Sequence, residues 1–295
     1  MLPRQVLPTI LAAALAVPLA SCASVLSSST TDKDPATITL GYIPTWPEGL
    51  SAAFLLDNKL KAAGYAVEHT PLSDASSVYT ALASGDIDIY PAAWPEHTHK
   101  QYMDEHGRTI EDYGAFYDNA RLTWAVPEYV DGVDSIADLK GQAGRFDGRV
   151  VGIEPGAGLT KASQETIDAY DLTDYTLATS STPAMLSELE SATAAKKDIV
   201  VTLWRPFWAN STFAVKDLQD PEGTLDTTEG LHWLARGGFE SDNPEVAEWL
   251  RELKLDDDHY GSLEDLIVNE YGEGQEPAAV QEWLDKNPDT VEDIK

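Results

Sequence analysis

Short apolar runs alternate with helix-like segments from Thr37 onward, and this alternation limits the fold more than any other feature of the sequence. The first three runs are TITLGYI at 37–43, AVEHTPL at 66–72 and DIDIYPAAW at 86–94. Two segments with the apolar spacing of helices separate them, at 50–65 and 74–85. In the second, Asp74 is a candidate N-cap and Gly85 a candidate C-cap. The β-α-β-α-β order predicts a parallel sheet with crossover helices.

A second block of the same kind follows, and the two blocks predict two lobes. Its segments are a strand, glycine-rich turn and helix at 149–170, a strand at 176–181, a helix at 182–197 and a strand at 198–204. We expect lobe 1 to comprise residues 37–125 plus about 232–295, and lobe 2 about 126–231, with a cleft between them. The last part of the chain is predicted to be mainly helical, with Trp249 and Trp283 in its core.

The first 22 residues are typical of a bacterial lipoprotein signal. One arginine precedes an apolar run from Val6 to Leu19, which is shorter than the roughly 20 residues of a spanning helix. The segment ends in Leu-Ala-Ser-Cys, so we expect cleavage of residues 1–21, lipidation of Cys22 and a flexible tether at 22–36. An ordinary signal peptide is the alternative. Cys22 is the only cysteine, which excludes an intramolecular disulfide framework and a cysteine-rich metal site.

The chain carries 50 acidic and 20 basic residues, a formal charge of −30. Such a surface repels nucleic acid and anionic lipid headgroups, so neither is expected as a partner. Solubility in a salty exterior accounts for the charge, which by itself identifies no ligand.

Three tryptophans, each close to a proline, follow predicted strands: Trp46, Trp94 and Trp204. The strand before Trp94 is predicted to end where the run Ile87–Tyr90 meets Pro91. Ligands of open parallel sheets bind outside the carboxyl ends of the strands. An indole face attracts a quaternary ammonium ion by about 0.5–2 kcal/mol per ring. Indoles also stack on sugar rings, so both ligand classes remain open at this point.

Six segments, in their order along the chain, carry a family resemblance. They are GYIPTWPEG at 41–49, GDIDIYPAAWPEHTHKQY at 85–102, RLTWAVPEYV at 121–130, GIEPGAGLTKAS at 152–163, AMLSELESA at 184–192 and VVTLWRPFWANSTFAVKDLQDP at 200–221. From about Thr37 to Lys295 the chain resembles the substrate-binding proteins of glycine betaine/choline ABC importers. The resemblance implies a two-lobed, type II periplasmic-binding α/β fold, each lobe a mainly parallel sheet flanked by helices.

The same resemblance implies a function in uptake and osmoprotection. A lipid-anchored, extracytoplasmic monomer would bind a small quaternary ammonium compound between its lobes and deliver it to an ABC permease with its ATPase. The resemblance implies a binding protein that is not an enzyme and that needs no cofactor.

The aromatic cage of the family maps onto Trp46, Trp94 and Trp204. Trp124 is expected to be a fourth wall, with Tyr129 as the alternative. These assignments are implied by the resemblance.

Other positions bear on which ammonium compound binds. Glu48 matches an acid that helps hold the ligand in choline-binding relatives, and the backbone at Gly41 and Tyr42 matches a carboxylate-binding turn of betaine binders. The family pattern is W-x-P-H, and its histidine helps bind a betaine carboxylate. In this sequence Phe207 stands in the place of that histidine. Phenylalanine donates no hydrogen bond, and Arg205 is a candidate substitute. Choline, carnitine and other betaines therefore stay open.

Other residues suggest functions other than the binding of an ammonium compound. His97 and His99, with Glu96 and His106, could indicate metal transport, although a solvated helix start explains them as well. The segment at 152–163 has the glycines of a phosphate cradle without G-K-[ST], so a tight turn is predicted. No G-x-S-x-G or H-E-x-x-H motif indicates an enzyme. A donor-rich cleft would favour a sugar ligand, and indoles converging on one small volume would favour the ammonium.

Overall fold

The computed structural model describes residues 36–225 and 227–295 of the chain. The predicted signal segment 1–21, Cys22 and all of the tether except its last residue lie outside the described residues. In the described part of the chain, none of the helices has the length and apolar character needed to cross a membrane.

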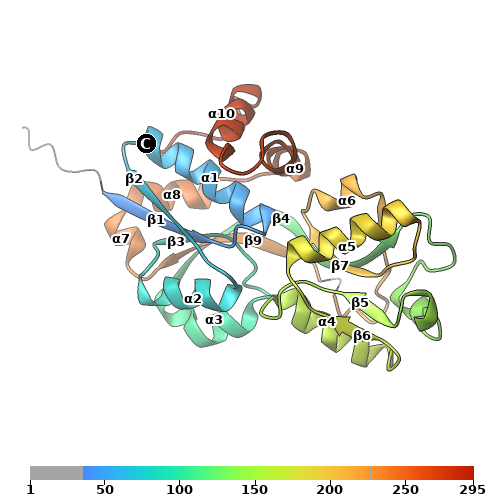
Figure 1. Cartoon of the computed structure of the whole chain (residues 1–295). Coiled ribbons are helices and arrows are strands. Elements are labelled where there is room, and N and C mark those ends of the chain that lie inside the picture. Colours follow the sequence, from blue (N-terminus) through green and yellow to red (C-terminus); the bar gives the residue numbers. More distant parts are fainter. Residues whose placement is uncertain (1–35, 226) are drawn as a thin grey trace, which may run out of the picture. The chain divides into compact units, whose positions relative to one another are not determined.

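The predicted parallel sheet at the start of the described chain is confirmed. Strand β1 (Thr37–Tyr42) pairs in parallel with both β2 (Ala66–Pro71) and β3 (Ile89–Ala93). Helices α1 (Pro47–Ala62) and α2 (Ala75–Ser84) make the two crossovers. Figure 1 shows α1 and α2 on opposite faces of these strands. The sheet therefore brings the carboxyl ends of β1 and β3 to one edge, where Trp46 and Trp94 follow.

Helix α2 begins and ends where the sequence predicts. The Asp74 carboxylate accepts a hydrogen bond from the Ser77 backbone N–H at 2.8 Å, and the hydroxyl of Ser77 caps Asp74 in return. Gly85 ends the helix with φ of 80°, a left-handed conformation that costs glycine little.

Two long strands that were not predicted from the sequence join the rest of the sheet. They are β4 (Ile110–Pro127) and β9 (Glu229–Arg236). The strand order is β2-β1-β3-β9-β4-β7-β5-β6, in which β7 is Val201–Arg205, β5 is Arg149–Val151 and β6 is Thr176–Ala178. The first part of β4 pairs antiparallel with β9, and its last part pairs antiparallel with β7 (Val201–Arg205) and β8 (Val215–Asp217). Strand β4 therefore belongs to both halves of the sheet, as Figure 1 shows.

The second predicted α/β block is also confirmed. Strand β5 (Arg149–Val151) pairs in parallel with β6 (Thr176–Ala178) and with β7. Helix α4 (Gly158–Ala169) connects β5 to β6, and α5 (Thr182–Ala195) connects β6 to β7.

Short helices complete the described chain. They are α3 (Lys100–His106), α6 (Ala209–Thr212), α7 (Phe239–Asp242), α8 (Pro244–Glu252), α9 (Asp257–Asp265) and α10 (Glu276–Lys286), with 3₁₀ turns at Gly107–Thr109, Ile136–Leu139 and Ala143–Arg145 and a π-helical turn at Leu266–Tyr271. Trp249 in α8 and Trp283 in α10 are buried, so their predicted core role is confirmed.

Two predicted boundaries are wrong. Strand β3 does not end at Pro91 but continues to Ala93, with a register shift against β9 and a φ of 57° at Ala92. Proline is tolerated at a β-bulge because the backbone there does not have to donate a hydrogen bond to the neighbouring strand. The predicted strand 198–204 includes Trp204 and agrees with β7 in this respect, whereas the placement of Trp204 beyond a strand end is wrong.

Replacing Asp74 tests the helix cap. Asp74→Ala should lower the free energy of unfolding by about 1 kcal/mol, because the N–H of Ser77 loses its acceptor. Asp74→Asn is the control, since asparagine caps about as well. Urea unfolding followed by circular dichroism measures both. Equal stability of the alanine and asparagine variants would contradict the capping role.

Candidate functional site

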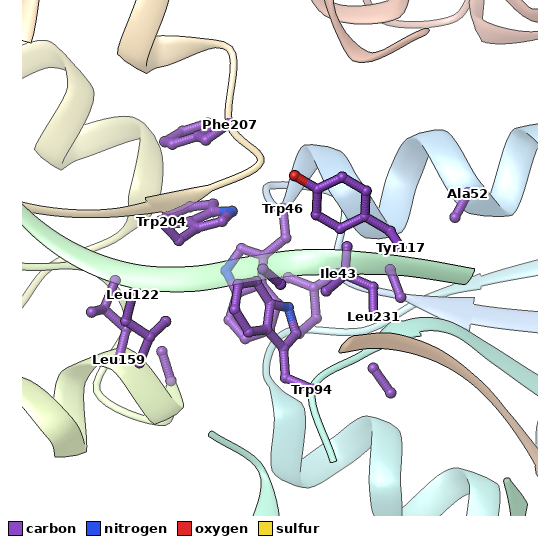
Figure 2. Packing of buried hydrophobic residues seen from close by; sticks show 14 of the residues in the cluster. Ile43, Trp46, Ala52, Trp94, Tyr117, Leu122, Leu159, Trp204, Phe207 and Leu231 are labelled. Carbon is purple, nitrogen blue, oxygen red and sulfur yellow. The ribbon is translucent and has the colours of Figure 1, made fainter. Parts of the chain in front are cut away.

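A small buried cavity lies where the three predicted tryptophans meet. Its volume is about 20 Å³, close to the roughly 10–15 Å³ needed by one water molecule. Figure 2 shows Trp46 and Trp94 beside each other, with Trp204 next to them. The lining residues are Trp46, Glu48, Trp94, Thr98, His99, Leu122, Ile153, Ala157, Gly158, Leu159 and Trp204. The indoles thus converge on one small volume.

Trp46 is placed by the turn between β1 and α1. It occupies the N-cap position of α1 in an extended conformation, and Pro47 follows at the first helical position, where proline fits well. Its indole N–H donates to the Glu154 carboxylate, with 3.5 Å between nitrogen and oxygen. Its ring stacks on that of His99, with the ring centroids 6.1 Å apart. Contacts on both sides therefore hold this indole in the wall of the cavity.

Trp94 is placed by the bulged end of β3 and by His99. The Trp94 carbonyl accepts the His99 N–H at 2.7 Å, and the Trp94 N–H points to His99 Nδ1 at 3.4 Å. His99 is 1% exposed, and burial lowers its pKa to about 3, so the ring is neutral at pH 7. From the sequence, His99 was considered as a metal ligand or as part of a solvated helix start, and its burial contradicts the second interpretation. Its position five residues after Trp94 carried no signal of a role in this wall.

Trp204 is placed by β7, and Phe207 covers one of its faces. The two rings stack with centroids 4.0 Å apart and an interplanar angle of 6°. Figure 2 shows this stack beside the other indoles. The guanidinium of Arg205, the candidate carboxylate binder, instead donates to Asp217 at 2.8 Å. Neither Phe207 nor Arg205 lines the cavity.

Glu48, in the first turn of α1, is the charged residue among those that line the cavity. Its carboxylate accepts the Trp204 indole N–H at 3.1 Å, and the side chain is 2% exposed. Burial raises the pKa of Glu48 to about 7, although hydrogen bonds from Trp204 and Trp94 oppose the rise. A cation in the cavity would favour the ionised carboxylate, so the site can couple cation binding to proton release.

The start of α4 closes the cavity on another side. Ala157, the N-cap of α4, makes no side-chain cap, and Gly158 and Leu159 follow in the wall. Ahead of them, the Glu154 carboxylate accepts from the backbone N–H of Thr182 at 2.9 Å and from the hydroxyl of the same residue. The glycine-rich segment therefore forms the predicted tight turn, and its helix presents backbone N–H groups near the cavity.

Three predicted site residues lie outside the cavity lining. Trp124 is fully buried and donates its indole N–H to the Ser163 hydroxyl at 2.9 Å. The hydroxyl of Tyr129 donates to the Lys197 carbonyl at 2.7 Å. Tyr42, whose backbone was expected in a carboxylate-binding turn, is also not among the lining residues, and its ring packs edge-on against that of His69 with centroids 5.7 Å apart. The geometry therefore supports none of the three as a wall of this cavity.

The histidines considered for metal binding lie in different environments. His99 faces the cavity, whereas His97 is exposed. Within residues 36–225 and 227–295, no group of three or more His, Cys, Asp or Glu side chains is arranged to hold a metal ion. What the site offers is an aromatic enclosure with a buried carboxyl group, which suits a small organic cation.

Known proteins resemble this chain over most of its length. The family described as the substrate binding domain of ABC-type glycine betaine transport system matches residues 36–286. A glycine betaine/carnitine transport binding protein of Listeria monocytogenes is 36% identical over 147 residues, 48% of this chain and 47% of the relative. The match thus spans about half the length of that curated relative.

Two solved structures share both sequence and fold with it. The glycine betaine/L-proline-binding protein of Borrelia burgdorferi is 30% identical, with a TM-score of 0.79, covering 87% of this chain and 97% of its own. A lactococcal protein in its closed-liganded conformation, complexed with glycine betaine, is also 30% identical, with a TM-score of 0.80, covering 87% and 98%. The predicted fold class is confirmed, and the family consists of transport binding proteins rather than enzymes. The chain belongs to the family of substrate-binding domains of ABC-type glycine betaine transport systems.

Proposed function

We propose that this protein captures a small quaternary ammonium compound in a cage formed by Trp46, Trp94 and Trp204, and delivers it to the permease of an ABC importer. The observation that carries the proposal is the convergence of three indoles and the buried Glu48 carboxyl on one small cavity. A quaternary ammonium ion has no N–H donor, so ring faces and a nearby negative charge are the contacts that attract it.

The strength of binding depends on the enclosure. Each desolvated ring contributes up to about 2 kcal/mol, whereas micromolar affinity requires about 8 kcal/mol. Glu48 adds an attraction that is strong because water is excluded. Pro47 and Pro95 stiffen the chain beside two of the indoles, which reduces the freedom lost on binding.

The charges around the cavity favour a ligand with a net positive charge. Among the residues that line it there is no lysine or arginine, His99 is neutral at pH 7, and Arg205 is paired with Asp217. A choline-like cation meets only attraction from Glu48, whereas the carboxylate of a betaine also meets repulsion. N–H groups at the start of α4 are the donors best placed for a ligand oxygen. We therefore place choline ahead of glycine betaine and carnitine.

We extend the proposal to the lobes predicted from the sequence, 37–125 plus about 232–295 and about 126–231. Hydrogen bonds join residues of the two predicted lobes around the cavity, from Trp204 to Glu48 and from Trp46 to Glu154. A ligand that touches both lobes stabilises the closed state, which is the signal for the permease. Lipidation of Cys22 would hold this monomer at the outer face of the bacterial cell membrane.

Ligand titration tests the proposed function. Isothermal titration calorimetry on the unlipidated protein, with choline, glycine betaine, carnitine, proline betaine and a sugar panel, should give the tightest binding for choline. Absence of heat with every quaternary ammonium compound, together with a response to a sugar or a metal ion, would refute the proposal. Tighter binding of glycine betaine than of choline would refute the order of ligands alone.

Truncation of one indole tests the cage. Trp94→Ala should weaken choline binding at least tenfold, because a ring face and part of the water-excluding wall are lost. Trp249→Ala is the matched control, since Trp249 is buried in α8 and lies outside the cavity lining. Circular dichroism verifies that both variants fold. Equal affinity of Trp94→Ala and wild type would assign Trp94 to packing only.

Proton linkage tests the role of Glu48. The bound cation holds the pKa of Glu48 below its ligand-free value of about 7, so binding releases a proton below that pH. Choline affinity should therefore rise as pH increases from 5.5, by at most about tenfold per unit, and level off above about 7. Glu48→Gln should bind more weakly with a flatter pH profile. A wild-type affinity that is constant between pH 5.5 and 8 would contradict this linkage.

A further inference from the structure

The segment 95–99 forms one wall of the cavity, because Thr98 and His99 both line it. This segment is a turn rather than a strand or a long helix, so its own backbone pairing does not fix its position. Its placement must come from contacts with other parts of the chain.

Glu229, at the start of β9, supplies three of those contacts. Its carboxylate accepts the backbone N–H of His97 at 3.1 Å and that of Thr98 at 3.1 Å, and it also accepts the Thr98 hydroxyl. Glu229 is 3% exposed, so these hydrogen bonds to a buried carboxyl group are shielded from water. Glu229 is 131 residues away from Thr98 along the chain.

A second residue of β9 contacts the same segment. The ring of His232 lies between two carboxylates, with Nε2 3.2 Å from Glu96 and Nδ1 2.8 Å from Asp112 of β4. Strand β9 therefore contacts the segment at Glu96 as well as at the two following residues. The beginning of β9 thus acts as a support behind this wall.

On its other side, Thr98 meets the start of α4 at very close range. A Cβ atom added to Gly158 would lie 2.5 Å from the Thr98 carbonyl oxygen and 2.4 Å from its methyl group. Backbone atoms cannot give way as a flexible side chain does, so only glycine permits this approach. The contact joins two walls of the cavity, the 95–99 segment and α4.

We infer that Glu229 is a positioning residue for the ligand site: it holds Thr98 against Gly158 and so keeps the cavity closed around its occupant. The inference rests on the proposed function as far as the occupant is concerned. Loss of the carboxylate would free the N–H groups of His97 and Thr98, and the wall would then open more often. Such opening speeds ligand release more than it slows association.

Variants of Glu229 test whether its carboxylate holds the 95–99 segment in place. A variant of Gly158 tests whether the contact between Thr98 and Gly158 keeps the cavity closed. Glu229→Ala removes all three acceptor contacts, and Glu229→Gln keeps one acceptor oxygen. Gly158→Ala leaves Glu229 in place but pushes Thr98 away. Gly144→Ala is the matched control, because a Cβ atom there meets nothing within 4 Å.

Two measurements are made on each folded variant. Hydrogen exchange of the ligand-free protein reports protection of the His97 and Thr98 amides, and stopped-flow tryptophan fluorescence gives the choline association and dissociation rates. Glu229→Ala should lose at least tenfold in amide protection and release choline at least tenfold faster, with partial recovery in Glu229→Gln. Gly158→Ala should release choline faster while both amides stay protected. Gly144→Ala should match wild type.

The outcomes are distinct. Unchanged amide protection in Glu229→Ala, or lost protection with unchanged choline release, would overturn the inference. If wild-type protein binds none of the ammonium compounds, the proposed function fails. In that case the exchange result still decides whether Glu229 holds the segment.

Discussion

The hydrogen bond from the Trp204 indole to the buried Glu48 carboxylate joins two segments that are 156 residues apart in the chain, and the cavity depends on it. Glu48 lies in the first turn of α1, two residues after Trp46, and Trp204 lies near the end of β7. A buried carboxyl group without partners would be costly, so the indole N–H of Trp204 stabilises Glu48 in its buried position. The other walls of the cavity come from the 95–99 segment and from α4.

The protonation state of the Glu48 carboxyl group links the site to the charge of its ligand. Burial raises the pKa of Glu48 to about 7, so near neutral pH the ligand-free carboxyl is partly protonated. A quaternary ammonium ion would stabilise the ionised carboxylate, which burial has deprived of solvating water. The selectivity that we propose follows from this arrangement, because a neutral sugar offers no such charge and a zwitterion brings a second carboxylate.

The departure from the family pattern at Phe207 has a consequence for packing. Phe207 stacks on one face of Trp204 with a centroid distance of 4.0 Å, and Trp204 itself lines the cavity. An aromatic ring in this position supports Trp204 but donates no hydrogen bond to a ligand. In the function that we propose, the loss of a donor and the gain of an aromatic support together favour recognition of the cationic group.

Local patterns were sufficient for much of the fold and for part of the site. Asp74 and Gly85 bounded α2 correctly because a cap depends on residues within one turn. Strands β4 and β9 were missed, since each is defined by pairing with distant strands, and β4 carries polar residues such as Asp118 and Asn119. Trp124 shows what local patterns could not predict. It lies two residues beyond the cavity-lining Leu122, about 7 Å along the strand. At that point its indole packs against α4 and donates to Ser163 instead.

By itself, the sequence determined the α/β alternation, the helix caps and the presence of proline-flanked tryptophans near strand ends. These features depend on neighbouring residues, so they can be read without knowledge of the fold. The tertiary structure decided which aromatic rings share the cavity, that His99 belongs to its wall, and that Glu229 holds the 95–99 segment. Those outcomes depend on the three-dimensional packing of the chain. Trp46 stacks on His99, and the contacts of Trp204 with Glu48 and of Glu229 with Thr98 join residues more than 100 positions apart, so local spacing does not predict them.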